Sequence, residues 1–391
     1  MTRIRLLLLL VILSVGILTL NGCGKSKKEA SDPAPDRHVQ SPIATDGSKD
    51  ATPATAVLRR YEFRTFGSID GLFIVNDDGF EPDAVNRQFE DARNRVERVN
   101  ALMSLYQPGS EVNRLVLATE DSPATLSADT LDVLSFCAKA FNASDGAFDP
   151  TIPPVWKLYG FKRGQQPTLP TDEQISDAMR RVGFDKIIID VERRTGWPSV
   201  SGMGIDLGAV AKGYAVDVAY QSLASAGFRG VLVEIGGEMR GSGIRPDGKP
   251  FVGGLRHPRM ESLFGDFDIP VNGLAIATSG DYEQFITVNG KRYSHIIDAR
   301  TGRPVSSGLI SVTIFAPDCM TADALATTVS VIGFDEGKRM LAADFPGAEC
   351  IALSRPADNG LLSDTGDDMR LDMTDGVKQL LTFRLRPPSE K

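Results

Sequence analysis

Apolar residues recur every three or four positions in the first long segment of this 391-residue chain, a spacing that predicts an amphipathic helix. Within residues 83–102, the apolar stripe contains Val85, Phe89, Val96 and Val99. Shorter patterns and capping residues predict further helices. These cover a short helix begun by Ser110, residues 128–141, a helix capped by Thr171 and ending at Val182, a helix that follows a strand end after Gly204 and reaches about Ala226, and residues 322–332 and 336–343.

Short β-rich runs are interspersed with these helices. Residues 61–75 predict a hairpin broken at Gly67 and Gly71. Because strands come in runs, with helices between only some of them, the order indicates an α+β fold with mixed or antiparallel sheets rather than a βαβ repeat. The other predicted strands are residues 186–191, 231–235, 239–243, 251–255, 265–269, 274–278, 293–297, 310–315 and 349–353.

Residues 1–22 have the composition of a bacterial lipoprotein signal. Arg3 and Arg5 precede a nearly unbroken apolar run over residues 6–20, which is too short to span a membrane comfortably. The run stops just before Cys23, so we expect cleavage before this residue and a lipid on its sulfur. The alternative is an ordinary secretory signal with an incidental cysteine. Either signal places the mature protein outside the cytosol, and the lipid would hold it in a periplasmic location at a bacterial membrane.

The segments flanking the predicted domain are too polar to fold by themselves. Residues 23–57 contain almost no large apolar side chains, so we expect a disordered tether. Residues 386–391 are expected to form a disordered tail. The stretch between them, residues 58–385, is long enough for a sizeable core, in one domain or in two closely joined lobes.

Charge and cysteine content exclude some classes of function. The formal net charge of −8 argues against nucleic acid as a partner. Besides Cys23, the chain has Cys137, Cys319 and Cys350. Three cysteines cannot pair completely and no CxxC spacing occurs, so we expect buried free thiols rather than a disulfide framework or a zinc site.

Candidate catalytic chemistry is concentrated in two polar stretches. The first, S-H-I-I-D-A-R-T-G-R-P, contains His295, one of only three histidines in the chain. The second, M-T-A-D-A-L-A-T-T, puts Asp323 and Thr327 four residues apart, on one face of a helix. A structural histidine and a solvated helix cap are the plain alternatives. The neighbours of Asp323 are small and apolar, however, which predicts a buried carboxylate that needs a compensating charge such as Mg²⁺.

Glycine-rich stretches suggest close backbone approaches to a phosphate. G-I-D-L-G-A-V-A-K-G-Y-A, residues 204–215, brings main-chain N–H groups and Lys212 to a helix N-terminus, which suits an anion. Its spacing matches neither a Walker loop nor GxGxxG, so its specificity is weak. E-I-G-G-E-M-R-G-S-G, residues 234–243, and A-T-S-G-D-Y-E, residues 277–283, add two further tight approaches.

Taken together, seven ordered motifs closely resemble the ApbE family of FAD:protein FMN transferases. They are M-S-L-Y-Q-P-G-S-E-V-N-R-L, G-A-F-D-P-T-I, G-I-D-L-G-A-V-A-K-G-Y-A-V-D, E-I-G-G-E-M-R, A-T-S-G-D-Y-E, S-H-I-I-D-A-R-T-G-R-P and A-P-D-C-M-T-A-D-A-L-A-T, within about residues 63–353. The resemblance implies an ApbE-like α+β fold with FAD in a cleft between lobes. It also implies transfer of FMN from FAD to a threonine or serine hydroxyl, with release of AMP. The implied acceptors are extracytoplasmic flavoprotein subunits, such as those of sodium-pumping NADH:quinone oxidoreductase and Rnf complexes.

The resemblance also implies roles for individual residues. Asp323, Thr327 and the Ala209 main-chain carbonyl would bind Mg²⁺, and His295 would be the base for the acceptor hydroxyl. A magnesium ion and an imidazole base suit attack on a charged phosphorus. The implied FAD contacts are Ser104, Leu105, Tyr106, Ala147, Phe148, Asp149, Asp206, Lys212 and Ile297.

Several points remain open at this level. Tyr106 and Phe148 offer flat surfaces for stacking, and a core role for Phe148 is equally compatible with the sequence. Pro153, Tyr159 and Ala299 depart from residues common in the family and leave the loop near residue 153 undetermined. A magnesium-dependent FAD pyrophosphatase or a flavin-storing lipoprotein would use the same FAD site. Retention of His295, Asp323 and Thr327 argues against the storage lipoprotein, whereas the pyrophosphatase shares every named residue and only product analysis with an acceptor protein separates it from the transferase.

Overall fold

The computed structural model describes residues 57–77, 79–162, 164–260, 262–355 and 369–385. The predicted signal peptide, the lipid attachment at Cys23, the tether up to residue 56 and the tail from residue 386 lie outside the described residues. Within the described ranges, every helix is too short or too polar to cross a bilayer.

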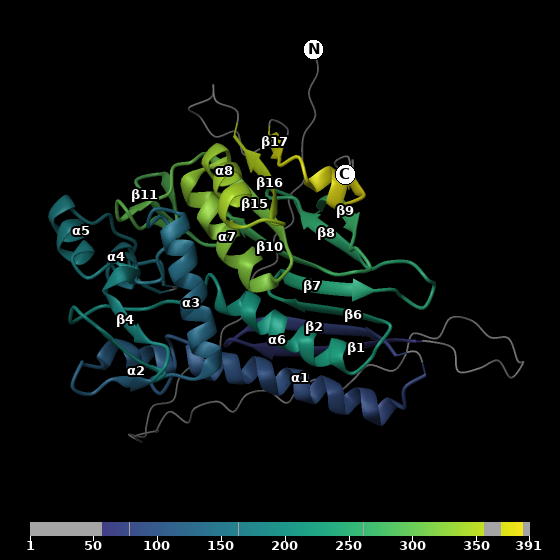
Figure 1. Cartoon of the computed structure of the whole chain (residues 1–391). Helices are drawn as coiled ribbons and strands as arrows, with labels where there is room; N and C mark the ends of the chain where they lie inside the picture. Colours follow the sequence, from purple (N-terminus) through teal and green to yellow (C-terminus); the bar gives the residue numbers. More distant parts are fainter. Residues whose placement is uncertain (1–56, 78, 163, 261, 356–368, 386–391) are drawn as a thin grey trace, which may run out of the picture. The chain divides into compact units, whose positions relative to one another are not determined.

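A central antiparallel sheet organises the described part of the chain, as Figure 1 shows. All neighbouring strands in it are antiparallel. This arrangement confirms the predicted α+β class. The strand order is β1 (Leu58–Thr65), β2 (Ile69–Asn76), β6 (Gly230–Ile235), β7 (Glu238–Gly243), β10 (Leu274–Gly280), β15 (Leu309–Ala316), β16 (Glu349–Ser354) and β17 (Arg370–Met373).

The first hairpin turns where predicted, but its second strand is continuous. Gly67 lies in the turn between β1 and β2, with a positive φ of 87°. Gly71 instead lies inside β2, opposite Phe63. A Cβ atom at Gly71 would come within 2.5 Å of the Phe63 ring. The predicted break at Gly71 is therefore wrong, because the missing side chain makes room for an aromatic ring.

Helices cover one face of the sheet. The apolar stripe predicted for the first helix is buried and packs in the main hydrophobic cluster with the third and sixth helices. The seventh helix begins three residues earlier than predicted, because the Asp318 carboxylate accepts a hydrogen bond from the Thr321 N–H at 2.8 Å. The helices on this face are α1 (Pro82–Met103), α3 (Ala128–Ala143), α6 (Ala211–Ser225), α7 (Cys319–Ile332) and α8 (Phe334–Asp344).

The other face of the sheet carries its own apolar layer. In β10, Ala275 and Ala277 face the helices, whereas Ile276 packs with Phe267 and Phe315 on the opposite side. This alternation follows from the two-residue period of a strand. The elements of the opposite layer are β8 (Val252–Arg256), β9 (Leu263–Asp268), α9 (Val377–Leu380) and β18 (Phe383–Leu385).

Shorter elements frame one end of the helical layer. The sequence did not predict β3, β5, α4, β11, β14 or the two 3₁₀ turns, nor the elements beyond residue 357. Thr171 caps helix α5 as predicted, in a capping box with Gln174. The helix ends at Met179, before the predicted Val182. These elements are α2 (Glu111–Leu117), β3 (Ala124–Thr125), α4 (Pro153–Trp156), α5 (Asp172–Met179), β4 (Ile187–Asp190), β5 (Thr195–Pro198), β11 (Phe285–Val288), β12 (Lys291–Ser294), β13 (Ile297–Asp298), β14 (Arg303–Pro304) and the 3₁₀ turns Lys157–Tyr159 and Phe184–Lys186.

Two predicted strand segments are irregular in the structure. The strand expected over residues 293–297 is interrupted, because the Ser294 hydroxyl accepts from the Ile296 N–H at 3.2 Å and turns the chain. The segment after Gly204 is a loop rather than a strand end. There the Asp206 side chain accepts a hydrogen bond from the Gly208 N–H at 2.9 Å, so this main-chain donor is not available for strand pairing.

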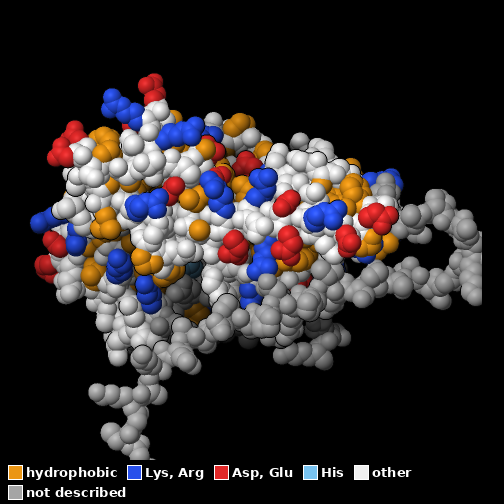
Figure 2. All heavy atoms as spheres, turned by 90° about the horizontal axis from the view of Figure 1, so that it is seen from below, with side chains coloured by type: hydrophobic (Ala, Val, Ile, Leu, Met, Phe, Trp, Pro, Cys, Tyr) orange, Lys and Arg blue, Asp and Glu red, His pale blue; other side chains and the backbone are white. Residues whose placement is uncertain are grey.

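The cysteines and the surface charges complete the description of the fold. Cys137, Cys319 and Cys350 are free and buried, as expected. On the face shown in Figure 2, acidic and basic side chains are interspersed, without a large area of one sign.

Candidate active site

A cavity of about 590 Å³ brings together segments that are far apart in the sequence. Its walls come from the end of α1, the loops before α4 and α6, the strands β7 and β10, the segments on either side of the β11–β12 hairpin, and α7. Each residue predicted for catalysis, FAD contact or metal binding lines it. They are Ser104, Leu105, Tyr106, Ala147, Phe148, Asp149, Asp206, Ala209, Lys212, His295, Ile297, Asp323 and Thr327. Their convergence in one cavity leaves their individual roles as predictions.

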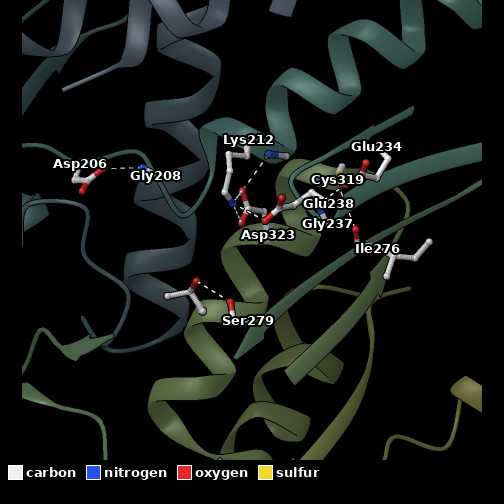
Figure 3. A network of polar contacts seen from close by, with 12 residues as sticks. Asp206, Gly208, Lys212, Glu234, Gly237, Glu238, Ile276, Ser279, Cys319 and Asp323 are labelled. Carbon is white, nitrogen blue, oxygen red and sulfur yellow. Dashed lines mark hydrogen bonds and ion pairs between the residues drawn. The ribbon is translucent and has the colours of Figure 1, made fainter. Parts of the chain in front are cut away.

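A buried charge network lies in the wall of this cavity. The Lys212 ammonium is 2.5 Å from Glu238 Oε1, and 3.3 and 3.5 Å from the two Asp323 oxygens. Figure 3 shows the three side chains meeting from α6, β7 and α7. Burial opposes the charge on Lys212, but the two carboxylates outweigh it and raise the pKa of the ammonium. Lys212 therefore remains a cation, held chiefly by Glu238.

Close contact between α6 and α7 sets the position of Asp323. The Gly213 N–H donates to Asp323 Oδ2 at 3.0 Å. A Cβ atom at Gly213 would lie 2.2 Å from the Cys319 carbonyl oxygen, so only glycine lets the two helices approach this closely. The close helix contact thus lets the Gly213 N–H hold the Asp323 carboxylate, which also lines the cavity.

Hydroxyl groups extend the polar wall along α7. The Thr327 hydroxyl lies one helical turn beyond Asp323 and is 3.2 Å from the Ser279 hydroxyl of β10. Ala209 lines the same cavity from the loop that precedes α6. In the described part of the chain, no group of three or more His, Cys, Asp or Glu side chains is placed to hold a metal. The predicted set has a single carboxylate, so it would not form such a group.

His295 lies between β12 and β13, at the open end of the β11–β12 hairpin. Its Nδ1 atom is 2.9 Å from the Gln284 main-chain oxygen. Burial lowers the pKa of the imidazole below its usual 6.5, and Lys212 lowers it further, against the effect of the Gln284 hydrogen bond. The nearby Asp298 accepts from Arg300 at 2.9 Å instead of from the histidine. The ring is therefore neutral at neutral pH.

The predicted FAD contacts fall into exposed and buried groups. Tyr106 is 67 % exposed, and the Lys162 ammonium is 4.9 Å from the centre of its ring. Phe148 is only 4 % exposed and belongs to the main core cluster, which favours the core role that the sequence left open. Ile297 is also largely buried and packs in a smaller cluster.

The two acidic residues in this group differ in their remaining hydrogen-bonding capacity. Asp149 accepts from Thr151 through both the N–H and the hydroxyl, and from the Phe184 N–H at 3.1 Å. Its carboxylate therefore organises the loop. Burial raises the pKa of Asp206, which accepts at 2.9 Å from the Gly208 N–H through Oδ1. Asp206 is the better placed of the two to meet a polar ligand group.

Comparison with known proteins now assigns the family. The family model for ApbE matches residues 72–352, which is more than half of the chain. The chain belongs to the ApbE family.

Relatives and a solved structure agree with this assignment. The chain is 36 % identical over 250 residues to the FAD:protein FMN transferase of Vibrio cholerae serotype O1, covering 64 % of this chain and 74 % of the relative. It is 35 % identical over 270 residues to the Haemophilus influenzae protein of the same name, covering 66 % and 77 %. The structure of the flavin transferase ApbE from Vibrio cholerae superposes with a TM-score of 0.69 at 28 % identity, covering 83 % of this chain and 99 % of that one. The ApbE-like fold expected from the motifs is thereby confirmed.

The cavity of this ApbE-family chain also contains polar residues that sequence reasoning did not select. Glu238, Ser279, Glu283, Gln284 and Lys162 line it beside the predicted residues. The first four lie in or next to the E-I-G-G-E-M-R and A-T-S-G-D-Y-E motifs. In both motifs the sequence analysis considered only the glycines, whereas the carboxylate and hydroxyl side chains are the groups that line the cavity. Lys162 lies outside all seven motifs.

Proposed function

We propose that this ApbE-family chain transfers FMN from FAD to a threonine or serine hydroxyl of an acceptor protein and releases AMP. The observation that carries the proposal is the single cavity lined by His295, Lys212 and Asp323. Its volume of about 590 Å³ lies within the usual range for small-molecule sites, about 300–1,000 Å³. The shared name of the relatives, FAD:protein FMN transferase, supports the same reaction.

The proposed reaction is a displacement at phosphorus. The acceptor oxygen attacks the FMN-side phosphorus of the FAD diphosphate, and the bond to the bridging oxygen breaks. The hydroxyl proton passes to Nε2 of His295, and AMP leaves with the bridging oxygen. His295 suits this role because Nδ1 faces the Gln284 carbonyl, which only accepts hydrogen bonds, so the lone pair of a neutral ring is on Nε2.

The residues present fit a magnesium ion. The donors proposed from the family resemblance are all oxygens: the Asp323 carboxylate, the Thr327 hydroxyl and the Ala209 carbonyl, which is the donor type that Mg²⁺ prefers. The Asp323 carboxylate is buried and therefore needs positive charge beside it, of which Lys212 supplies a part. A bound Mg²⁺ would neutralise charge on the diphosphate during the displacement.

The proposed partners and location follow from the family resemblance and the N-terminal sequence. We propose acceptors of the extracytoplasmic flavoprotein type, including subunits like those of sodium-pumping NADH:quinone oxidoreductase and Rnf complexes. We also propose a lipid anchor on Cys23 that keeps the enzyme at a bacterial membrane.

Incubation with FAD, Mg²⁺ and a candidate acceptor tests the reaction directly. The expected result is a covalent FMN adduct on one acceptor hydroxyl, detected by mass spectrometry, with AMP in equal amount. Free FMN and AMP without an adduct would instead identify an FAD pyrophosphatase. FAD binding with no cleavage would identify a flavin carrier.

A further inference from the structure

Glu238 has one buried oxygen whose partner the described residues do not supply. Its side chain is the first of β7, follows the Gly236-Gly237 turn, and lines the cavity. Only 5 % of the residue is exposed. Oε1 accepts from Lys212, whereas Oε2 is buried and has no hydrogen-bond partner among the described residues. A buried polar atom in that state is costly unless a ligand completes it.

The position of Lys212 gives a second indication. Its ammonium is 2.5 Å from Glu238 but 3.3 Å from the nearer oxygen of Asp323. Glu238 therefore holds the ammonium more closely than Asp323 does, and Asp323 accepts only the longer contacts from it, at 3.3 and 3.5 Å. Without Glu238, the same ammonium would pair fully with Asp323 and compete with any other cation there.

The charge of the network points to the class of the missing group. Two carboxylates and one ammonium leave one negative charge in excess when both acids are ionised. Burial raises the pKa of Glu238 and the nearby Asp323 adds to this, whereas Lys212 lowers it, so a further positive charge beside Oε2 would favour the ionised form. An anionic phosphate beside Oε2 would add repulsion. A hydrated divalent cation would supply both positive charge and water hydrogens, because Mg²⁺ keeps several of its waters in proteins.

We propose that Glu238 is a positioning residue for the divalent cation of this site. One of its oxygens holds Lys212 away from Asp323, and the other accepts a hydrogen bond from water carried by the cation. This inference rests on the proposed function, whose Mg²⁺ site contains Asp323. It adds a residue that binds no metal directly but sets how strongly the metal is bound.

Binding of Mn²⁺ alone, without FAD or acceptor, tests the inference. Calorimetry or electron paramagnetic resonance on the purified protein gives the dissociation constant for wild type, Glu238→Gln and Glu283→Gln. We expect Glu238→Gln to weaken Mn²⁺ binding about 10- to 100-fold. Glu283 is the control for charge alone, because its more exposed carboxylate lines the same cavity and acts on Lys212 and Asp323 by charge, without a hydrogen bond to either among the described residues. Its substitution should change the dissociation constant no more than about threefold, the size of a screened charge effect.

A second variant separates charge from position. Glu238→Asp keeps the negative charge but shortens the side chain by one methylene, so it should also bind Mn²⁺ more weakly than Glu283→Gln does. Thermal melts without metal verify that each variant is folded. Equal affinities for Glu238→Gln and Glu283→Gln, or Mn²⁺ binding that survives Asp323→Ala, would overturn the inference.

The failure of this inference differs from failure of the proposed reaction. If the wild type forms the FMN adduct while Glu238→Gln binds Mn²⁺ as tightly as wild type, Glu238 has no such role and the transferase assignment stands. If wild type binds Mn²⁺ with the expected dependence on Glu238 but forms no adduct, the cation site stands and the transfer reaction is wrong.

Discussion

The imidazole of His295 is fixed by the main chain of Gln284, whose oxygen lies 2.9 Å from Nδ1. The two residues face each other at the open end of the β11–β12 hairpin, and the His295 N–H also donates to the same oxygen at 3.2 Å. Because a carbonyl only accepts, the hairpin selects the tautomer with the proton on Nδ1. Nε2 is then the basic nitrogen of the ring.

Replacement of His295 by alanine should therefore affect chemistry more than binding. Loss of a general base typically slows a reaction about 10²- to 10⁴-fold, and we expect a decrease of this size in FMN transfer. The FAD dissociation constant, followed by flavin fluorescence, should change much less. If transfer and FAD affinity fell by the same factor, His295 would be a structural residue of the cavity.

The same nitrogen predicts the acid limb of the pH profile. Burial lowers the pKa of His295 below 6.5, so the neutral base persists as the pH falls past that value. Transfer at saturating FAD should stay level near neutral pH and then decline as the pH passes through the lowered pKa. The variant His295→Ala should lack this decline in its residual activity. A decline at the same pH in the variant would assign it to another group.

Asp323 provides the third prediction. Asp323→Ala removes the proposed carboxylate ligand and the acceptor for the Gly213 N–H, so Mg²⁺-dependent transfer should be lost. The measurement is adduct formation across a range of Mg²⁺ concentrations. Asp298→Ala is the control, because that carboxylate pairs with Arg300 and does not line the cavity. Unchanged transfer in Asp323→Ala would remove the metal assignment.

Much of this site could be predicted from the sequence because its residues lie in short local motifs. Asp323 and Thr327 are on one helix, and the helix period alone puts their oxygens on one face. The motif match then added Ser104 and Asp206, which are distant in sequence from α7 yet line the same cavity. The periodic apolar residues of α1 likewise predicted a long helix almost to its observed ends.

What the sequence did not reveal depends on contacts between distant segments. Glu238 follows two glycines, and the motif was interpreted from the backbone conformation of those glycines alone. Its partner Lys212 is 26 residues earlier in the chain. Gly71 predicted a break in the strand, whereas the structure has the ring of Phe63 over this glycine. The strand at residues 293–297 is interrupted by the hydroxyl of Ser294, a local bond that hydrophobic patterning cannot detect.

Cys23 provides the fourth prediction, which concerns location. If the N-terminal signal is of the lipoprotein type, Cys23→Ser prevents lipid attachment, and the protein should move from the membrane fraction to the soluble extracytoplasmic fraction. Fractionation of cells followed by immunoblotting gives the distribution. Cys137→Ser is the matched control, since that thiol is buried in α3 and should leave the distribution unchanged. Membrane attachment that survives Cys23→Ser would exclude the lipid anchor.

Gly213→Ala should damage the site through packing alone. The added Cβ would lie 2.2 Å from the Cys319 carbonyl oxygen and 2.9 Å from the Asp323 Cβ, so α6 and α7 must separate. Overpacking of this kind typically costs about 1–3 kcal/mol, more than the roughly 1 kcal/mol that alanine gains over glycine within a helix. We expect a lower melting temperature and, because the Gly213 N–H moves away from Asp323, weaker metal-dependent transfer.

A glycine without neighbours provides the matched comparison. Gly109, in the loop before α2, would place a new Cβ with no heavy atom within 4 Å, and its φ is not positive. Gly109→Ala should therefore melt within a degree or two of wild type, about the range expected of a neutral surface change. Equal melting temperatures for the two variants would mean that α6 and α7 tolerate a wider separation, and Asp323 would then owe its position to Lys212 rather than to the helix contact.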